Sequence, residues 1–291
     1  MCGIVGLFLK DSTLQPRLGE LLSGMLVTMS DRGPDSAGIA VYRQSGAPVI
    51  KVTVQSPDPE RDFAGLADRL GAPLILADSH AIVTCPPDRA AAVLQAIRAD
   101  KALRVMSWGQ DIEIYKEVGL PHTVAERFAI PAMAGRHGIG HTRMATESAV
   151  TTLGAHPFST GADQCLVHNG SLSNHNALRR QLARENIHVE TENDTEVGAA
   201  YLTWKMRDGA NLGQALEAAV HDLDGFYTFV VGTRNGFGVL RDPIACKPAV
   251  LAETDRYVAF GSEYRALAAL PGIDAARVWE PEPATVYFWE H

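Results

Sequence analysis

The sequence predicts an α+β fold in which two β-sheets pack together and helices cover them. Short strand-like runs stand at both ends of the 291-residue chain, at residues 3–9 and 284–290. Helical patterns lie between them at 174–186, 195–208 and 212–223, and a meander of four short β-rich runs follows. Because a sheet needs a second layer to bury its apolar face, strands from both ends with helices between them favour packed sheets covered by helices.

The N-terminal third begins with the apolar run Gly-Ile-Val-Gly-Leu-Phe-Leu at residues 3–9, which is typical of a buried strand. Residues 19–30 have the apolar spacing of a helix, which ends in a loop at 31–38 that contains glycine and proline. Residues 38–43 and 48–54 have the composition of strands. Because only four residues separate them, and one is a glycine, we expect these two strands to form a hairpin.

The middle of the chain changes character after a polar connection that contains two prolines. Residues 63–110 alternate between helical and strand-like patterns, and we expect them to form a small α/β unit inserted in the main domain. Residues 111–128 are expected to form a helical connection back to that domain. Strand patterns return at 135–143 and 164–170, so the predicted organisation is one domain over residues 1–291 with one insertion.

The charge pattern argues against nucleic acid and membrane as partners. The formal net charge is −8, the basic residues are scattered, and no block of like charge occurs. A nucleic-acid-binding protein would instead show clustered basic residues. No stretch approaches the roughly 18 apolar residues of a membrane span.

The N-terminus and the cysteines predict a cytoplasmic protein. Residues 1–11 lack the positively charged start and the long apolar run of a secretory signal. Cys85, Cys165 and Cys246 form no Cys-x-x-Cys pair with one another or with Cys2. This pattern favours reduced thiols in a reducing compartment, and we expect the three later cysteines to be small buried hydrophobic side chains.

Cys2 follows the initiator methionine and is the first candidate for chemistry. Its small side chain permits removal of Met1, after which one residue would carry both a thiol and the free α-amine. An α-amine, with a pKa of about 7.7–8.0, can act as general base toward a thiol, whose ordinary pKa is about 8.5. The alternative is that Cys2 is a small residue at the start of a buried strand.

Two segments further along supply a tight loop and a cation. Residues 31–38, Asp-Arg-Gly-Pro-Asp-Ser-Ala-Gly, can form a fixed loop beneath an active site or a plain turn from helix to strand. Arg143 ends a strand pattern. A guanidinium binds a carboxylate through two parallel hydrogen bonds, so Arg143 suits the α-carboxylate of an amino acid, and an internal ion pair is the alternative.

Two more segments supply hydrogen-bond donors and an anion. Asn169 and Gly170 offer a side-chain amide and an unhindered backbone N–H side by side, as an oxyanion hole requires. An Asn-Gly turn is the alternative. Asp194 precedes a helical pattern, where it can cap the helix, bind a substrate ammonium, or do both.

Four histidines, His137, His141, His156 and His168, crowd into a short stretch of the chain. Their spacing matches no metal-binding pattern, so we expect no metal site. His156, in the segment Gly-Ala-His-Pro-Phe, is the histidine expected to approach the substrate.

Six segments, in this order, closely resemble the class II glutamine amidotransferases. They are MCGIVG, DRGPDSAG, GHTRMAT, AHP, HNG and NDTE. Members of this family are N-terminal-nucleophile hydrolases, so the resemblance implies a four-layer αββα sandwich. It covers most of the chain apart from about residues 63–110.

The resemblance implies a role for each matching residue. Cys2 is the implied nucleophile, with its own amine as the base. Asn169 and the Gly170 N–H are the implied oxyanion hole. Arg143 binds the carboxylate of L-glutamine and Asp194 its ammonium. The expected reaction is hydrolysis of L-glutamine to glutamate and ammonia through a thioester on Cys2.

The sequence departs from the pattern of some relatives near the implied substrate site. Met144 stands where glucosamine-6-phosphate synthases tend to have tryptophan, and Glu147 where they usually have histidine. Thr146, between them, stands where the family makes a further substrate contact. A third departure lies at residues 241–248. These differences concern the acceptor of the ammonia rather than the glutaminase chemistry.

The chain stops at His291 without a synthase domain, so we expect the acceptor half on another polypeptide. The opening residues and the predicted insertion resemble the stand-alone amidotransferase subunits of glutamate-synthase-like complexes, and most closely those of N-methylglutamate synthase. That resemblance implies companion subunits, a flavin bound by one of them, and no cofactor in this chain.

Other functions remain open at this point. The chain could be a non-catalytic regulatory or scaffold subunit that kept the fold, or the glutaminase subunit of a different amidotransferase. It could also be an amide hydrolase of the same fold that acts on another substrate. Arg143 and Asp194 argue against the last alternative, because they match both ends of an amino acid.

Overall fold

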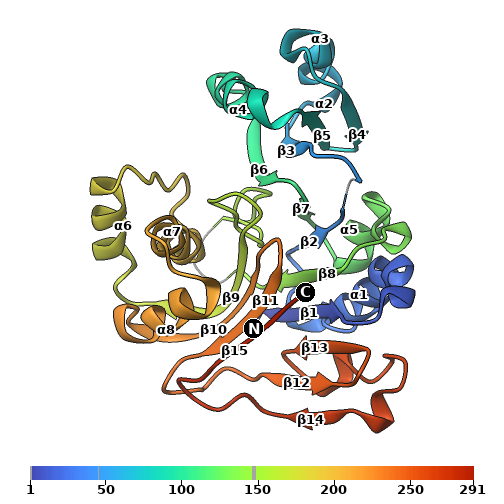
Figure 1. Ribbon diagram of the computed structural model, residues 1–291, viewed down its shortest axis with the longest axis vertical. Coiled ribbons are helices and arrows are strands. Elements are labelled where there is room, and N and C mark those ends of the chain that lie inside the picture. Colours follow the sequence, from blue (N-terminus) through green and yellow to red (C-terminus); the bar gives the residue numbers. More distant parts are fainter. Residues whose placement is uncertain (1, 45, 146–148) are drawn as a thin grey trace.

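The computed structural model describes residues 2–44, 46–145 and 149–291. Its main body is a pair of packed antiparallel sheets (Figure 1). The larger sheet has seven strands within these residues, in the order β14-β12-β13-β1-β8-β2-β7. Its strands are β1 (Gly3–Leu9), β2 (Ser36–Tyr42), β7 (Ile112–Val118), β8 (His137–Arg143), β12 (Val250–Glu253), β13 (Tyr257–Gly261) and β14 (Arg277–Trp279).

The second sheet of the body has the order β15-β11-β10-β9. It consists of β9 (Cys165–Leu172), β10 (Gly225–Gly232), β11 (Gly236–Arg241) and β15 (Val286–Glu290). Side chains from the facing sides of both sheets form one apolar layer, in which Ile4, Val230 and Phe260 are fully buried. The Phe237 ring packs directly on Gly6, where an added Cβ would lie 2.5 Å from the ring. The two sheets therefore pack closely at this point of β1.

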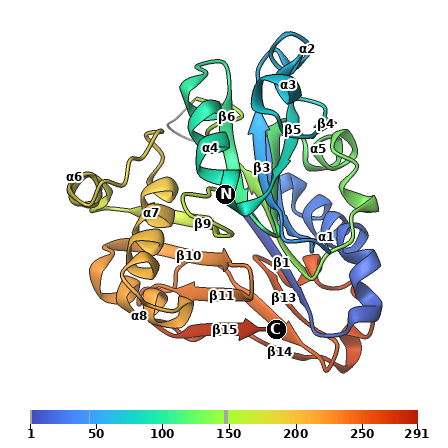
Figure 2. The same ribbon diagram turned by 45° about the horizontal axis from the view of Figure 1, so that its top comes forward.

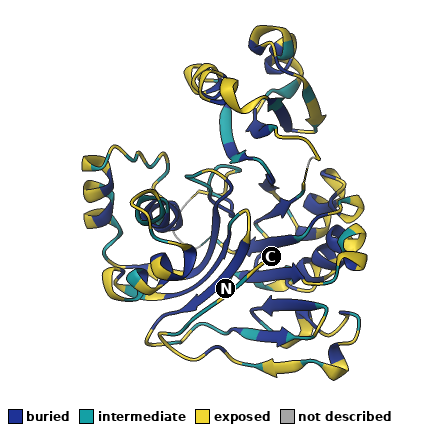
Figure 3. Ribbon diagram, in the orientation of Figure 1, coloured by how far each residue is buried: buried dark blue, intermediate teal, exposed yellow. Residues whose placement is uncertain are grey.

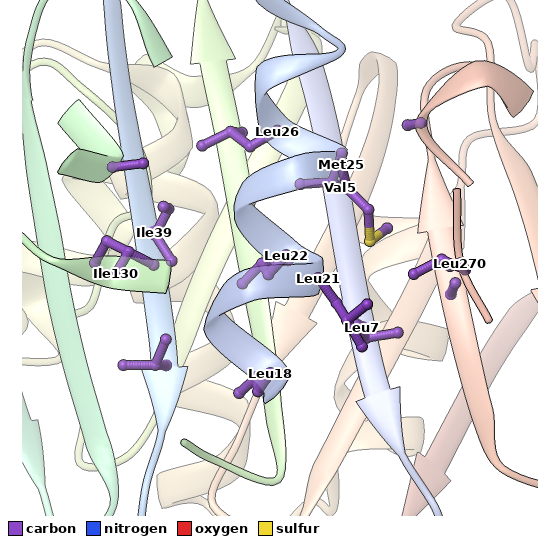
Figure 4. Close-up of a cluster of buried hydrophobic side chains, with 14 of the residues drawn as sticks. Val5, Leu7, Leu18, Leu21, Leu22, Met25, Leu26, Ile39, Ile130 and Leu270 are labelled. Atoms are coloured by element: carbon purple, nitrogen blue, oxygen red, sulfur yellow. The ribbon is translucent and has the colours of Figure 1, made fainter. Parts of the chain in front are cut away.

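Helices cover both outer faces of the sandwich (Figures 1 and 2). The seven-stranded sheet carries α1 (Leu18–Val27) and α5 (Pro121–Arg127), and the other sheet carries α6 (His175–Arg184), α7 (Asp194–Arg207) and α8 (Leu212–Asp222). The α1 side chains at positions 18, 21, 22, 25 and 26 recur with helical spacing, so one face packs across β1, β8 and β2 (Figure 4). The predicted four-layer αββα arrangement is confirmed.

A smaller unit at the top of Figure 1 has its own sheet, in the order β4-β5-β3-β6. Its elements are β3 (Ile50–Gln55), α2 (Pro59–Asp62), α3 (Leu66–Leu70), β4 (Leu74–Ala77), β5 (His80–Cys85), α4 (Ala90–Ala99) and β6 (Arg104–Gly109). A separate core that includes Val52, Val83 and Ile97 holds it together. We call residues 50–109 the small-sheet unit.

Short 3-10 helices connect these elements. They are η1 (Ser12–Arg17), η2 (Ser30–Arg32), η3 (Pro87–Arg89), η4 (Ile130–Ala132), η5 (Tyr264–Ala266) and η6 (Ile273–Ala275). Exposed residues lie mainly on the outward faces of the helices, whereas the central strands are buried throughout (Figure 3). Among the residues that the structure describes, no helix combines the length and the apolar composition that crossing a membrane requires.

Several sequence predictions were wrong in their local detail. β2 and β3 do not form a hairpin, because β2 pairs with β7 and β8 while β3 pairs with β5 and β6. The small-sheet unit therefore begins at Ile50 rather than near residue 63. Residues 112–118, expected to be helical, form β7 in the large sheet. Cys246 is exposed, although Cys85 and Cys165 are buried as expected.

Candidate active site

Cys2 lies just before β1, at the point where the two sheets of the body meet, and is partly exposed. The backbone after it is held on both sides. Gly3 N donates to Thr142 Oγ1 at 3.2 Å on β8, and Ile4 N donates to Ser262 Oγ at 2.9 Å beyond β13. The Cys2 thiol lies 3.9 Å from the carbonyl oxygen of Met144. The strand register thus fixes the main chain at Cys2 and leaves its thiol at the surface of the sandwich.

The carbonyl oxygen of Cys2 accepts hydrogen bonds from two directions. Asn169 Nδ2, on β9 of the opposite sheet, donates to it at 3.2 Å, and Arg32 Nε donates to it at 2.9 Å. Arg32 in turn pairs with Glu263, which also accepts from Arg265 Nε at 2.6 Å. The structure therefore brings the predicted nucleophile and the predicted oxyanion-hole amide together, and it adds Arg32.

Gly170 follows Asn169 in β9 and adopts a backbone conformation that only glycine tolerates there. Its φ is +139°, and an added Cβ would lie 1.9 Å from the Phe226 carbonyl oxygen. Gly170 is exposed, whereas Asn169 is buried. No other residue would fit this position without displacing β10.

Arg143, the last residue of β8, is buried, and its Nη1 donates to the Ala149 carbonyl at 3.3 Å. The loop 31–38 holds the chain around it. Asp35 N donates to the Arg143 carbonyl at 3.1 Å, and Asp35 Oδ2 accepts from Ala145 N at 2.8 Å. Gly33 lies so close to the main chain of β8 that an added Cβ would be 2.4 Å from the Thr142 carbonyl carbon. The loop predicted to underlie an active site therefore positions Arg143.

Asp194 is the first residue of α7, and about a quarter of its side chain is exposed. It does not cap the helix, because the Asn193 side chain accepts from Thr195 N at 2.9 Å and performs that role. Asp194 Oδ2 accepts from Leu172 N at 2.8 Å, and its Oδ1 lies 3.7 Å from His168 Nδ1. Burial by itself would raise the pKa of Asp194, but the contact with His168, the hydrogen bond from Leu172 N and the nearby His175 together lower the pKa below its usual value. Asp194 is therefore an anion at neutral pH.

His156 is buried behind Asp194. Its Nε2 lies 2.6 Å from Thr195 Oγ1, and its ring lies 4.0 Å from that of His141, centre to centre. The predicted contact between His156 and substrate stays a prediction. Thr146, the other predicted substrate contact, lies outside the described residues.

Within residues 2–44, 46–145 and 149–291, no group of three or more histidine, cysteine, aspartate or glutamate side chains could hold a metal ion.

A separate pocket of about 270 Å³ lies between the small-sheet unit and the start of α7. Its lining includes Arg104, Trp108, Lys116, Phe158 and Glu196. None of Cys2, Asn169 or Asp194 borders it. The nucleophile candidate thus lies outside this pocket.

Arg32 and Asp35 were not singled out from the sequence. The loop that contains them was predicted as a whole to lie near a site. Which of its side chains reaches Cys2 depends on how α1 packs against β8. Together, the site contains a thiol, an amide donor, a buried guanidinium and a carboxylate. These groups suit attack on a carbonyl of a substrate that carries one negative and one positive charge.

Comparisons with known proteins agree with this chemistry. The profile of the glutamine amidotransferase domain family matches residues 141–269. The glutamine amidotransferase-like protein GlxB of Rhizobium meliloti (strain 1021) is 67% identical over 299 residues, covering 100% of this chain and 99% of that protein. The glutamine–fructose-6-phosphate aminotransferase (isomerizing) of Vibrio vulnificus (strain YJ016) is 36% identical over 120 residues, which cover 41% of this chain and 20% of that protein.

Two solved structures share the fold. Glutamine phosphoribosylpyrophosphate amidotransferase from B. subtilis, complexed with ADP and GMP, matches with a TM-score of 0.63 at 19% identity. A structure described as the allosteric regulatory enzyme of purine biosynthesis matches with a TM-score of 0.66 at 19% identity. Each match covers 99% of this chain and 47% of the other. The chain therefore spans about half the length of either structure.

Proposed function

Since the chain belongs to the glutamine amidotransferase family, we propose that it hydrolyses L-glutamine to glutamate and ammonia with Cys2 as the nucleophile. The observation that carries the proposal is the contact between Asn169 Nδ2 and the Cys2 carbonyl, which holds the amide donor beside the thiol. Arg143 and Asp194 lie on segments that adjoin these two residues, at the end of β8 and the start of α7.

Glutamine binding uses both charged ends of the substrate. The Arg143 guanidinium binds the α-carboxylate, and the Asp194 carboxylate binds the α-ammonium. Asp194 is suited to this role because it stays ionised and partly exposed. Thr146 and His156 are proposed as further contacts that help to hold the substrate.

The reaction begins after removal of Met1. The free amine of Cys2 takes the thiol proton, and the sulfur attacks the side-chain amide carbon of glutamine. The negative charge that develops on oxygen is stabilised by Asn169 Nδ2 and the Gly170 N–H. The Cys2 ammonium then protonates the leaving nitrogen, so ammonia departs and a γ-glutamyl thioester remains. Water, deprotonated by the same amine, attacks the thioester and releases glutamate.

The ammonia is proposed to pass to a separate synthase subunit. The resemblance of the sequence to stand-alone amidotransferase subunits supports a glutamate-synthase-like complex, and within that group N-methylglutamate synthase. In such a complex the flavin belongs to a companion subunit, and the assembly works in the cytoplasm. Copurification with companion subunits, followed by an absorbance spectrum of the complex, tests this assignment.

Covalent trapping tests the glutaminase proposal and separates it from a scaffold role. We expect 6-diazo-5-oxo-L-norleucine, a glutamine analogue with an electrophilic carbon, to add one label at Cys2, in a protein whose intact mass lacks Met1. Cys2→Ala should lose both the label and all glutamine hydrolysis. Cys246→Ala is the matched control, since Cys246 is an exposed cysteine whose removal should change neither result. A fully active protein that retains Met1 would falsify the terminal-amine mechanism, and an unlabelled, inactive wild type would indicate a scaffold.

A further inference from the structure

The Thr195 hydroxyl connects two buried histidines behind Asp194. Thr195 Oγ1 lies 2.6 Å from His156 Nε2 and 3.0 Å from His168 Nδ1. The same His168 nitrogen lies 3.7 Å from Asp194 Oδ1. Thr195 is 1% exposed, so water does not compete for its hydroxyl. We call His156, Thr195 and His168 the Thr195 bridge.

The position of each proton in this bridge follows from the number of donors. The Thr195 hydroxyl has a single proton, so it donates to one imidazole nitrogen and accepts from the other. If it donated to His168 Nδ1, the lone pair of that nitrogen would face both the hydroxyl and the Asp194 carboxylate, which repels it. The Asp194 carboxylate therefore favours the opposite arrangement of the protons. His168 Nδ1–H points toward Thr195 Oγ1 and Asp194, and the Thr195 hydroxyl donates to His156 Nε2.

Two imidazoles, that of His156 in the bridge and that of His141 beside it, carry no positive charge. Burial lowers the pKa of His141 to about 3 and holds the pKa of His156 well below its ordinary value. His141 Nε2 lies 3.1 Å from the His168 carbonyl oxygen, so it holds the strand that carries His168. A neutral support matters here, because a cation close to Asp194 would repel the ammonium of the substrate.

We propose that Thr195 and His168 are positioning residues, which hold the Asp194 carboxylate in place for the α-ammonium of the substrate. The bridge supplies an oriented N–H dipole to Asp194 and leaves the carboxylate its full negative charge. This inference rests on the proposed function of the site, and it predicts that the bridge affects only ligands that have an α-ammonium.

Binding to a Cys2→Ala variant tests the proposal without catalysis. Calorimetry would compare L-glutamine with 5-amino-5-oxopentanoate, which is the same molecule without its α-amino group. Thr195→Val should raise the Kd for glutamine about three- to tenfold, as expected for one lost hydrogen bond. It should leave the Kd for the amine-free analogue unchanged, and Thr195→Ser should restore glutamine binding.

A matched control comes from the same helix. Thr203 Oγ1 lies 2.7 Å from Gln164 Oε1 and 2.8 Å from Thr160 Oγ1, away from Asp194. Thr203→Val removes a hydroxyl from α7 in the same way, and it should change neither Kd.

Nitrogen-15 NMR of the Cys2→Ala protein should show the His168 proton on Nδ1, which gives a readout that does not depend on the Thr195 variants folding.

The outcomes separate the inference from the proposed function. The bridge is overturned if Thr195→Val binds glutamine as its parent does, if both ligands weaken equally, or if the His168 proton lies on Nε2. If the Cys2→Ala parent binds no glutamine at all, the proposed function itself is wrong, and the inference is lost with it.

Discussion

Two buried polar clusters in this protein satisfy their hydrogen bonds in opposite ways. In the first, which we call the Glu113 cluster, Lys51 Nζ lies 2.8 Å from Glu113 Oε1, and Tyr115 Oη donates to Glu113 Oε2 at 2.8 Å. Arg43 Nη1 completes it at 3.1 Å from Oε2. The Lys51 ammonium also donates to the carbonyls of Arg43 and Asp111. This cluster is charged, and its central ion pair is fully hydrogen-bonded.

In the Thr195 bridge and its neighbour His141, only about half of the imidazole nitrogens have a hydrogen-bond partner. His141 Nδ1, His156 Nδ1 and His168 Nε2 are buried without a hydrogen-bond partner among the described residues. Buried polar groups usually find partners, and exceptions tend to lie at functional sites. The Glu113 cluster ties β3 of the small-sheet unit to β7 of the large sheet, whereas the bridge stands behind the candidate site. The Glu113 cluster is therefore suited to stability, whereas the bridge is the cluster that we propose to act in binding.

The largest expected effect is on stability, from breaking the Glu113 cluster. Glu113→Ala would leave the Lys51 ammonium buried without its counter-ion, and we expect the free energy of unfolding to fall by about 3–5 kcal/mol. Urea denaturation measures this loss. Glu20→Ala, which removes an exposed partner of Arg17, is the control and should leave the midpoint unchanged. An equal loss in both variants would remove the distinction between buried and exposed pairs.

A smaller effect is expected in how stability depends on pH. Burial lowers the pKa of His141 to about 3, whereas in the unfolded chain it is about 6.5. Between these values the unfolded chain binds more protons, so stability is lost as pH falls below 6.5. His141→Gln should reduce the slope of unfolding free energy by about 1.4 kcal/mol per pH unit between pH 6 and 4.

The Glu113 cluster should respond in a different pH window. Burial by itself would raise the pKa of Glu113, but Lys51, Arg43 and the Tyr115 hydroxyl together outweigh burial and lower the pKa. Its contribution is complete above the unfolded pKa of about 4.3 and is lost only as pH falls further. Urea titrations at several pH values therefore separate the two clusters. An unchanged slope in His141→Gln between pH 6 and 4 would contradict the neutral, buried histidine.

The smallest effect is expected at the exposed edge of the Glu113 cluster. The Arg43 side chain is 38% exposed, compared with 6% for Lys51. Arg43→Ala should therefore lower the unfolding free energy by no more than about 1 kcal/mol, because solvent screens an exposed pair. A loss as large as that of Glu113→Ala would show that Arg43, and not Lys51, is the essential partner.

Packed sheets covered by helices could be predicted because apolar periodicity marks strands and helices, whereas the four-layer αββα arrangement was implied by the resemblance of the motifs. The pairing of the strands could not be predicted, as β3 shows, because an alternating apolar pattern does not indicate which strand lies next to which. β7 was mistaken for a helical connection because Glu113, Lys116 and Glu117 interrupt its apolar residues. Each of these charges is buried with partners from elsewhere in the chain, such as the Ala155 carbonyl for Lys116. A pattern of residues along the sequence does not show such contacts between distant parts of the chain.

Two of the predicted site residues, Cys2 and Asn169, are in contact, in line with the site that the resemblance implied. The side chains that support them were not predicted. Arg32 reaches the Cys2 carbonyl through its guanidinium, and Thr195 reaches two histidines through its hydroxyl. Both contacts depend on the packing of distant elements, so a loop motif or a helix start alone does not reveal them.

The Asn169 amide has a consequence for the geometry of catalysis. Its nitrogen carries two hydrogens, and one of them points to the Cys2 carbonyl at 3.2 Å. In the proposed reaction, the other is available to the oxygen of the substrate. A single planar group would then set both the place of the attacking residue and the place of the charge that the attack creates.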